Sequence, residues 1–153
     1  MSTVQEQLKE SVDALMKLDP SEIEIELGRR LEATKKDLVA SPTLSAAALV
    51  IPPMDSTQLA AAPVWLKELG QKFLVKLNRQ MYSLVCDERD EDNAKIRAVV
   101  GSGAQQLALV MAGVLVASFG LLPGVATAVA VIVSKRLVKA GHEALCEQWK
   151  KSA

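Results

Sequence analysis

A long stretch without charge occupies the C-terminal half of the chain. No charged residue lies between Arg97 and Lys135, and residues 107–133 are almost all apolar or small. Such a segment avoids water either in the hydrocarbon of a bilayer or at the centre of a helical bundle. The hydrophobic pattern alone leaves both of these locations open.

The first forty residues repeat apolar positions at helical spacing, which predicts two amphipathic helices. The first covers about residues 3–18. The second begins at Pro20, because the preceding aspartate is a good N-cap and proline is favoured at the first helical position. It ends before Pro42, which disfavours helix in the residue ahead of it. Glu26 and Arg30 stand four residues apart, and we expect them to form an exposed supporting pair.

The pattern then weakens over residues 41–62, where two adjacent prolines exclude a continuous helix. We interpret this segment as a long connector with one short helical turn at most. A third helix is predicted from Pro63 to Asp87, with a broad apolar stripe that fits a helix touching two neighbours. Gly70 should weaken this helix locally by up to about 1 kcal/mol. The acidic residues 87–92 are expected to form a solvated corner.

Two further helices are predicted from the uncharged stretch and the residues that flank it. One passes through the glycines of residues 101–103 and continues to Phe119, and the next runs from Val125 to Lys150. Residues 120–124 contain two glycines and a proline, which are typical of a turn between antiparallel helices. Small residues at four-residue spacing would let the two helices approach closely. These small residues are Ala104, Ala108, Ala112, Gly113, Ala117, Gly124 and Ala128.

Together the elements predict an all-α fold, a bundle of about five helices with amphipathic helices packed around a C-terminal apolar helical hairpin. The chain of 153 residues is expected to form a single domain, 1–153. Within it, 1–40 is an N-terminal helical hairpin, 41–62 a connector and 63–87 an amphipathic helix. Residues 88–153 form the apolar hairpin with a basic amphipathic tail.

Composition narrows the class of protein further. The 18 basic and 18 acidic residues balance to a net charge of zero, which argues against a nucleic-acid partner. Two cysteines do not make a disulfide framework, so we expect them to be reduced. The first ten residues include acidic side chains and no apolar run, so we expect no secretory signal. The expected location is therefore cytoplasmic, either free or at the cytoplasmic face of a membrane.

The sequence offers little catalytic or metal-binding chemistry. His142 and Cys146 are four residues apart, a spacing that suits two metal ligands on one helical face, but two candidates fall short of a complete site. A single histidine supports no catalytic triad. The glycines near Ser102 lack the Gly-Lys-Ser/Thr ending of a phosphate loop. We therefore expect no enzyme activity, no metal and no cofactor.

The first functional hypothesis is a non-enzymatic, membrane-active or membrane-associated protein that shelters an apolar hairpin and can insert it. Lys135, Arg136 and Lys139 would then meet anionic headgroups, each contributing about 1 kcal/mol. The residues expected to enter the membrane or to form an interface are Leu107, Val110, Val114, Val116, Phe119, Leu121, Leu122, Val125, Val129, Val131 and Ile132.

Helix length limits this hypothesis. At about 1.5 Å per residue, residues 107–122 span roughly 24 Å, which is short of the roughly 30 Å hydrocarbon thickness. A hairpin that dips partway into the bilayer fits better than two full spans. The alternative is an all-α adaptor or oligomer subunit whose apolar hairpin is its core or its self-association interface. The expected partners are membrane lipid, a protein or a second copy of the chain.

Overall fold

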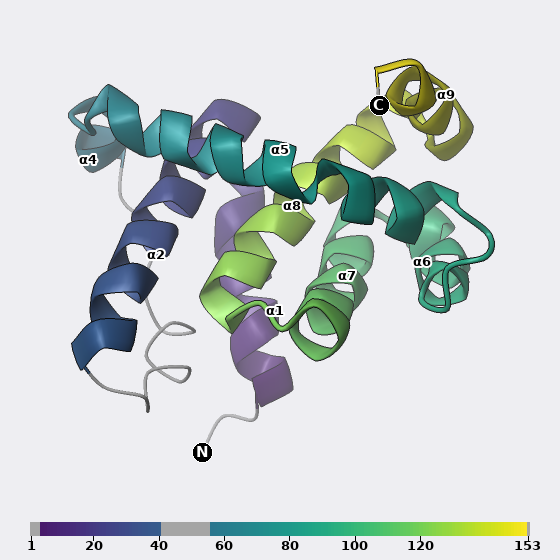
Figure 1. The fold of residues 1–153 in the computed structure, drawn as a ribbon, viewed down its shortest axis with the longest axis horizontal. Coiled ribbons are helices and arrows are strands. Elements are labelled where there is room, and N and C mark those ends of the chain that lie inside the picture. The colour runs from purple at the N-terminus through teal and green to yellow at the C-terminus, as the bar shows by residue number, and fades with distance from the viewer. Residues whose placement is uncertain (1–3, 41–55, 153) are drawn as a thin grey trace.

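A computed structural model describes residues 4–40 and 56–152, and these are folded entirely into helices and short connections. The described part contains eight α-helices, one 3-10 turn (Val100–Ser102) and no strand, which confirms the all-α class (Figure 1). The helices are α1 (Val4–Met16), α2 (Pro20–Ala40), α4 (Ser56–Ala60), α5 (Val64–Cys86), α6 (Asn93–Val99), α7 (Ala104–Phe119), α8 (Pro123–Ala140) and α9 (His142–Ser152).

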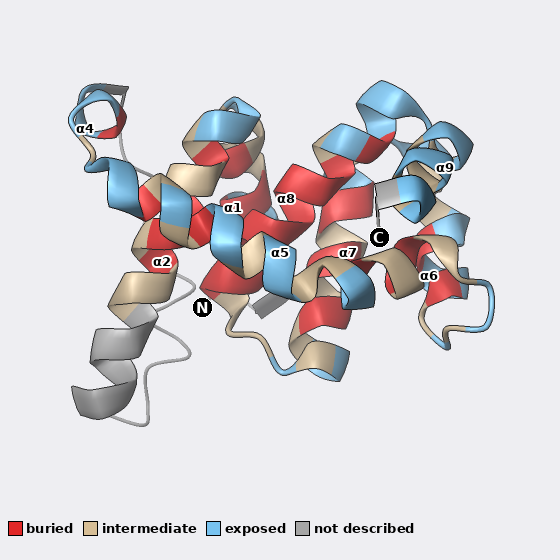
Figure 2. Ribbon diagram, turned by 45° about the horizontal axis from the view of Figure 1, so that its top comes forward, coloured by how far each residue is buried: buried red, intermediate tan, exposed pale blue. Residues whose placement is uncertain are grey.

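Helix α8 lies at the centre of the fold. Every residue from Gly124 to Ser134 is buried, and α1, α2, α7 and α9 all pack against this helix (Figure 2). This half of α8 has no polar face, so burial on all sides is the arrangement that removes its surface from water. The second half of the uncharged stretch thereby forms the centre of the core.

The predicted bounds of two helices are confirmed. α2 begins at Pro20, where the Glu22 amide donates to Asp19 Oδ1 at 2.8 Å and the Asp19 amide donates to Glu22 Oε1 at 3.0 Å. This reciprocal pair is a capping box, which satisfies amides that the first turn leaves unbonded. α5 begins and ends within one residue of its predicted limits. Most of the predicted connector, residues 41–55, lies outside the described residues, and α4 follows it.

Two predicted helices are wrong in length because each is broken at a glycine. Gly103 has φ of 96° and separates α6 and the 3-10 turn from α7. Gly141 has φ of 85° and separates α8 from α9. Backbone with φ in this range favours glycine over every residue that carries a side chain. The described residues therefore form eight helices where about five were expected.

Helices α2 and α5 cross at a point where both carry glycine. A Cβ atom added to Gly28 would overlap the carbonyl oxygen of Leu66, and one added to Gly70 would overlap that of Glu24. The two backbones are thus too close for any larger residue. Gly70, expected only to weaken its helix, allows this close approach.

Helix α9 is attached to the end of α5. Cys86 and Cys146 form a disulfide, which corrects the expectation of reduced cysteines. His142 Nε2 lies 2.7 Å from the carbonyl oxygen of Val85, within hydrogen-bonding distance. Trp149 Nε1 donates to Asn78 Oδ1 at 2.5 Å. These contacts hold α9 against α5. A short connection joins α9 to α8.

Candidate interaction surface

A polar cluster lies inside the bundle against the first turn of α8. Arg30, 1% exposed, donates from Nη1 to the Gly124 carbonyl oxygen at 2.8 Å and to Thr127 Oγ1 at 3.1 Å. Its Nε lies 3.4 Å from Glu26 Oε2, and Glu26 is fully buried. Arg29 Nη2 lies 2.9 Å from the same carboxylate oxygen. The cluster therefore ties α2 to the start of α8.

The expectation that Glu26 and Arg30 are exposed is wrong. Arg30 follows Ile23 by seven residues and Leu27 by three, so it lies on the apolar face of α2, and this spacing was the signal for its burial. Burial lowers the pKa of the Arg30 guanidinium, and the nearby Glu26 carboxylate opposes that shift. Because the cluster is enclosed, it is structural and offers no surface to a ligand.

The outward side of α7 is an uncharged surface. We call it the α7 face, and it comprises Gln106, Leu109, Val110, Gly113, Val116 and Ala117. These positions are half-buried or exposed. The opposite side of α7 packs on α1, α6 and α8. One side of an uncharged helix is therefore not fully covered by the described helices.

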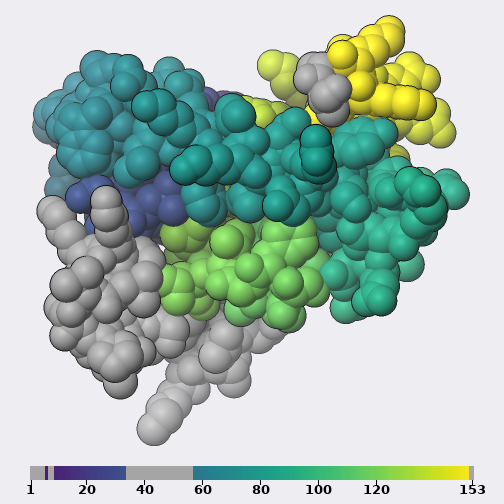
Figure 3. All heavy atoms as spheres, viewed as in Figure 1, coloured from purple at the N-terminus to yellow at the C-terminus, as the bar shows by residue number. Residues whose placement is uncertain are grey.

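The structure divides the predicted membrane or interface residues into two groups. Six are buried in the core, namely Leu107, Val114, Val125, Val129, Val131 and Ile132. Five are half-buried, namely Val110 and Val116 on the α7 face and Phe119, Leu121 and Leu122 at the turn into α8. In Figure 3 the end of α7 and this turn reach the molecular surface below α5. Only the second group is accessible in this fold.

The predicted basic residues do not gather beside the α7 face. Lys135 donates from Nζ to the carbonyl oxygen of Leu18, at the corner between α1 and α2. Arg136 lines a cavity between α5, α8 and α9, and Lys139 is exposed near the end of α8. The three basic residues therefore lie on different parts of the molecule and do not form one basic patch.

Acidic side chains lie near the C-terminal end of α7 instead. Asp92 accepts hydrogen bonds from Ser118 and Lys95, and these bonds lower the pKa of its carboxyl group in that order of size. The Lys95 Nζ lies 3.1 Å from Asp92 Oδ1. Asp92 also belongs to the turn that joins α5 to α6, which carries further acidic residues, Asp87, Glu88, Asp90 and Glu91. The predicted acidic corner is thus placed beside the end of the uncharged helix.

A hollow of about 400 Å³ adjoins the N-terminal end of the α7 face. It is lined by α1 and by the first turn of α7, with Lys9 and Val12 on one side and Gln105 and Leu109 on the other. At the edge of this hollow, the Gln105 side-chain amide donates a hydrogen bond to Asp13 Oδ1. The hollow shares Gln106 and Leu109 with the α7 face, and Lys9 is the one charged residue in its lining.

The remaining chemistry is structural. Cys146 is bonded to Cys86, and His142 Nε2 contacts the Val85 carbonyl oxygen, so Cys146 has no free thiol in this fold. Within the described ranges, no helix combines the length and apolar character needed to cross a membrane. Comparisons of the chain with protein-family models, with curated proteins and with solved structures find no match.

Proposed function

We propose that the protein is a non-enzymatic helical subunit that associates with a second copy of itself through the α7 face. In this arrangement α7 and α8 form an apolar helical hairpin. α8 is its buried arm, and α7 has one side in the core and the other in the interface. The observation that carries the proposal is the uncharged, incompletely covered outer side of α7.

The residues of the α7 face suit helix-to-helix packing. Gly113 lies near its middle and Ala117 one turn further on, and small residues let two helix backbones approach closely. A second copy presents the same uncharged face, so a twofold arrangement buries no unpaired charge. The partner that best fits the α7 face is therefore the α7 face of a second copy of the chain.

A lipid surface fits the α7 face less well. The predicted headgroup-binding residues Lys135 and Arg136 are directed to other parts of the molecule. Asp92 and its acidic neighbours lie near the end of α7, where an anionic bilayer would repel them. Electrostatics therefore favours a neutral protein surface over anionic lipid.

Gly113 provides a clean test, because an added Cβ atom there would meet no atom within 4 Å. Gly113→Arg should leave the monomer folded and place a charge in the proposed interface. Gly101→Arg is the matched control, since Gly101 is also open to solvent but lies outside the α7 face.

Sedimentation equilibrium over a wide concentration range measures the outcome. We expect the unaltered protein and Gly101→Arg to form dimers as concentration rises, and Gly113→Arg to remain monomeric. Circular dichroism should show the same helix content for all three proteins. A protein that stays monomeric at every concentration, or a Gly113→Arg variant that dimerises normally, would contradict the proposal.

A second candidate function, membrane association, is supported by the turn between α7 and α8. Phe119, Leu121 and Leu122 are large apolar residues that are only half-buried at this tip. A tip of this kind can enter the interfacial region of a bilayer without a complete span. Leu121→Glu should then abolish co-flotation with liposomes. Charges at Val114 or Val129 would test folding instead, because both are buried.

A further inference from the structure

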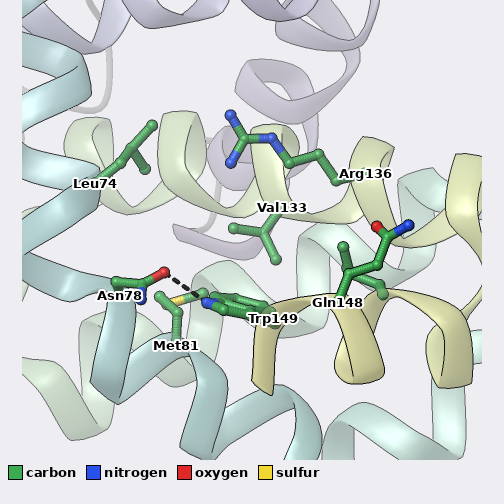
Figure 4. Close-up of a pocket in the computed structure, with 8 residues that line it drawn as sticks. Leu74, Asn78, Met81, Val133, Arg136, Gln148 and Trp149 are labelled. Carbon is green, nitrogen blue, oxygen red and sulfur yellow. Dashed lines mark hydrogen bonds between the residues drawn. The ribbon is translucent and has the colours of Figure 1, made fainter. Parts of the chain in front are cut away.

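A cavity of about 280 Å³ lies between α5, α8 and α9, away from the α7 face. Its apolar lining comes from Leu74 and Met81 of α5, Val133 of α8, and Leu145 and Trp149 of α9 (Figure 4). The volume of about 280 Å³ is just below the roughly 300–1,000 Å³ typical of ligand pockets. An apolar lining of this size suits a short hydrocarbon chain.

The polar groups of the cavity are mainly hydrogen-bond donors. The Arg136 side chain extends across the cavity toward Leu74, and Gln148 lies at the opposite edge (Figure 4). Asn78 has its oxygen engaged by Trp149 Nε1, which leaves its amide group as a donor. No acidic side chain belongs to the lining. A cationic side chain beside a cavity whose lining carries no acidic group favours a ligand with a negative charge.

Arg136 makes no ion pair or hydrogen bond with another residue in the part of the chain that the structure describes. Its exposed position means that it carries its charge without the cost of burial. A guanidinium binds a carboxylate through two parallel hydrogen bonds. The head of a bound ligand is therefore best supplied by a carboxylate.

We propose that this cavity binds a medium-chain aliphatic carboxylate. The carboxylate is bound by the Arg136 guanidinium. The hydrocarbon chain lies between Met81, Val133 and the Trp149 ring. This site is separate from the proposed dimer interface, and either can fail without the other.

Chain length provides a quantitative signature. Each methylene that enters an apolar cavity tightens binding by up to about fourfold, from about 0.8 kcal/mol per buried group. Octanoate should therefore bind up to about fifteenfold more tightly than hexanoate. Octanol, which has the same chain without the charge, should bind about tenfold or more weakly than octanoate, because charge-assisted hydrogen bonds are lost.

Binding can be followed by the emission of Trp149 in a Trp65→Phe background. Trp65 is half exposed near the start of α5, outside the cavity lining, so its replacement leaves Trp149 as the single tryptophan. Arg136→Gln should weaken octanoate binding about tenfold or more and leave octanol binding unchanged. The matched control is Lys139→Gln, an exposed cation on the same helix that does not line the cavity.

Calorimetric titration with octanoate provides an independent readout of the same variants. Leu145→Trp should fill the cavity and abolish binding of both octanoate and octanol, while circular dichroism shows that the bundle remains folded. Failure of octanoate to give saturable binding would overturn the proposal. Equal binding of octanoate by the Arg136→Gln variant and the parent would also overturn it.

Discussion

A single buried arginine connects two helices at the centre of this protein. Arg30→Ala removes one of the two arginines that pair with the buried Glu26 carboxylate, and with it the hydrogen bond to the Gly124 carbonyl oxygen. Because Arg29 still pairs with that carboxylate, we expect the free energy of unfolding to fall by about 1–3 kcal/mol, the usual cost of removing a buried hydrogen-bonding partner. Urea denaturation followed by circular dichroism measures it.

Two comparisons separate the buried pair from a general effect of losing a cation. Arg79→Ala, at an exposed position of α5, should change the free energy of unfolding by no more than about 0.5 kcal/mol. Glu26→Gln combined with Arg30→Met should recover much of the loss, because the buried carboxylate is removed together with its Arg30 partner. Equal losses in the Arg30 and Arg79 variants would refute the role assigned to the cluster.

Asp92 makes the stability of the protein depend on pH. Hydrogen bonds from Ser118 and Lys95 lower the pKa of its carboxyl group in the folded state. Its contribution is therefore complete above the unfolded pKa of about 3.9 and is lost as pH falls through the lower folded value. Asp92→Asn should flatten the fall in thermal midpoint below about pH 4. Glu91→Gln, at an exposed neighbour on the same turn, should keep the original profile.

At the level of the helices, the crossing of α2 and α5 depends on two glycines. Alanine in place of Gly70 improves helix propensity by about 1 kcal/mol, but its Cβ atom would overlap the Glu24 carbonyl oxygen. We expect the overlap to prevail and Gly70→Ala to destabilise the protein by about 1–3 kcal/mol. Gly113→Ala is the matched comparison, because Gly113 also lies inside a helix but has open space around it.

Gly113→Ala should raise the free energy of unfolding by up to about 1 kcal/mol, measured by urea denaturation at concentrations where the protein is monomeric. The opposite signs expected for the two alanine variants form the test. Stabilisation by both would show that the helices separate easily at the crossing.

The helices that sequence predicted best are those with local start and stop signals. Asp19, Pro20 and Glu22 define the start of α2 within four residues, and no distant contact is needed to interpret them. Gly103 and Gly141 were misjudged because a glycine inside an apolar pattern is compatible with a continuous helix or with a break. Tertiary packing decides between those two outcomes.

The candidate surface was predictable only in part. The absence of charge from Ala98 to Ser134 predicted that both α7 and α8 avoid water. It did not show which side of each helix would be buried. The structure places α8 at the centre and leaves one side of α7 accessible. Apolar periodicity cannot make this choice for a helix that is apolar on every side.

In the whole molecule, long-range links add to the core that α8 provides. Lys135 reaches Leu18, Arg30 reaches Gly124, and Cys86 is joined to Cys146 across 60 positions of sequence. None of these pairs has a local sequence signal, because partners far apart in the chain meet only after the helices have packed. The cysteines were expected to be reduced because two cysteines do not make a disulfide framework, and nothing in the sequence shows that Cys86 and Cys146 meet.

Reduction of the disulfide tests how strongly α9 depends on that link. A cross-link of this kind restricts the unfolded chain and typically contributes about 2–4 kcal/mol. We expect a reducing agent to lower the urea midpoint accordingly and to speed amide hydrogen exchange in α9 more than in α2. The Cys86→Ser/Cys146→Ser variant should match the reduced protein and show no further response to the reductant.

The disulfide between Cys86 and Cys146 is also relevant to the cellular location of the protein. Disulfides persist mainly in oxidising compartments, so the cytoplasmic location remains a prediction that redox state can test. Alkylation of free thiols in intact cells, followed by mass measurement, reports whether Cys86 and Cys146 are paired. A fully alkylated protein would support the cytoplasmic location and imply that α9 is held by His142 and Trp149 alone among the contacts described above. A protein protected from alkylation would place the folded chain in an oxidising environment and make the α5–α9 link a permanent part of its core.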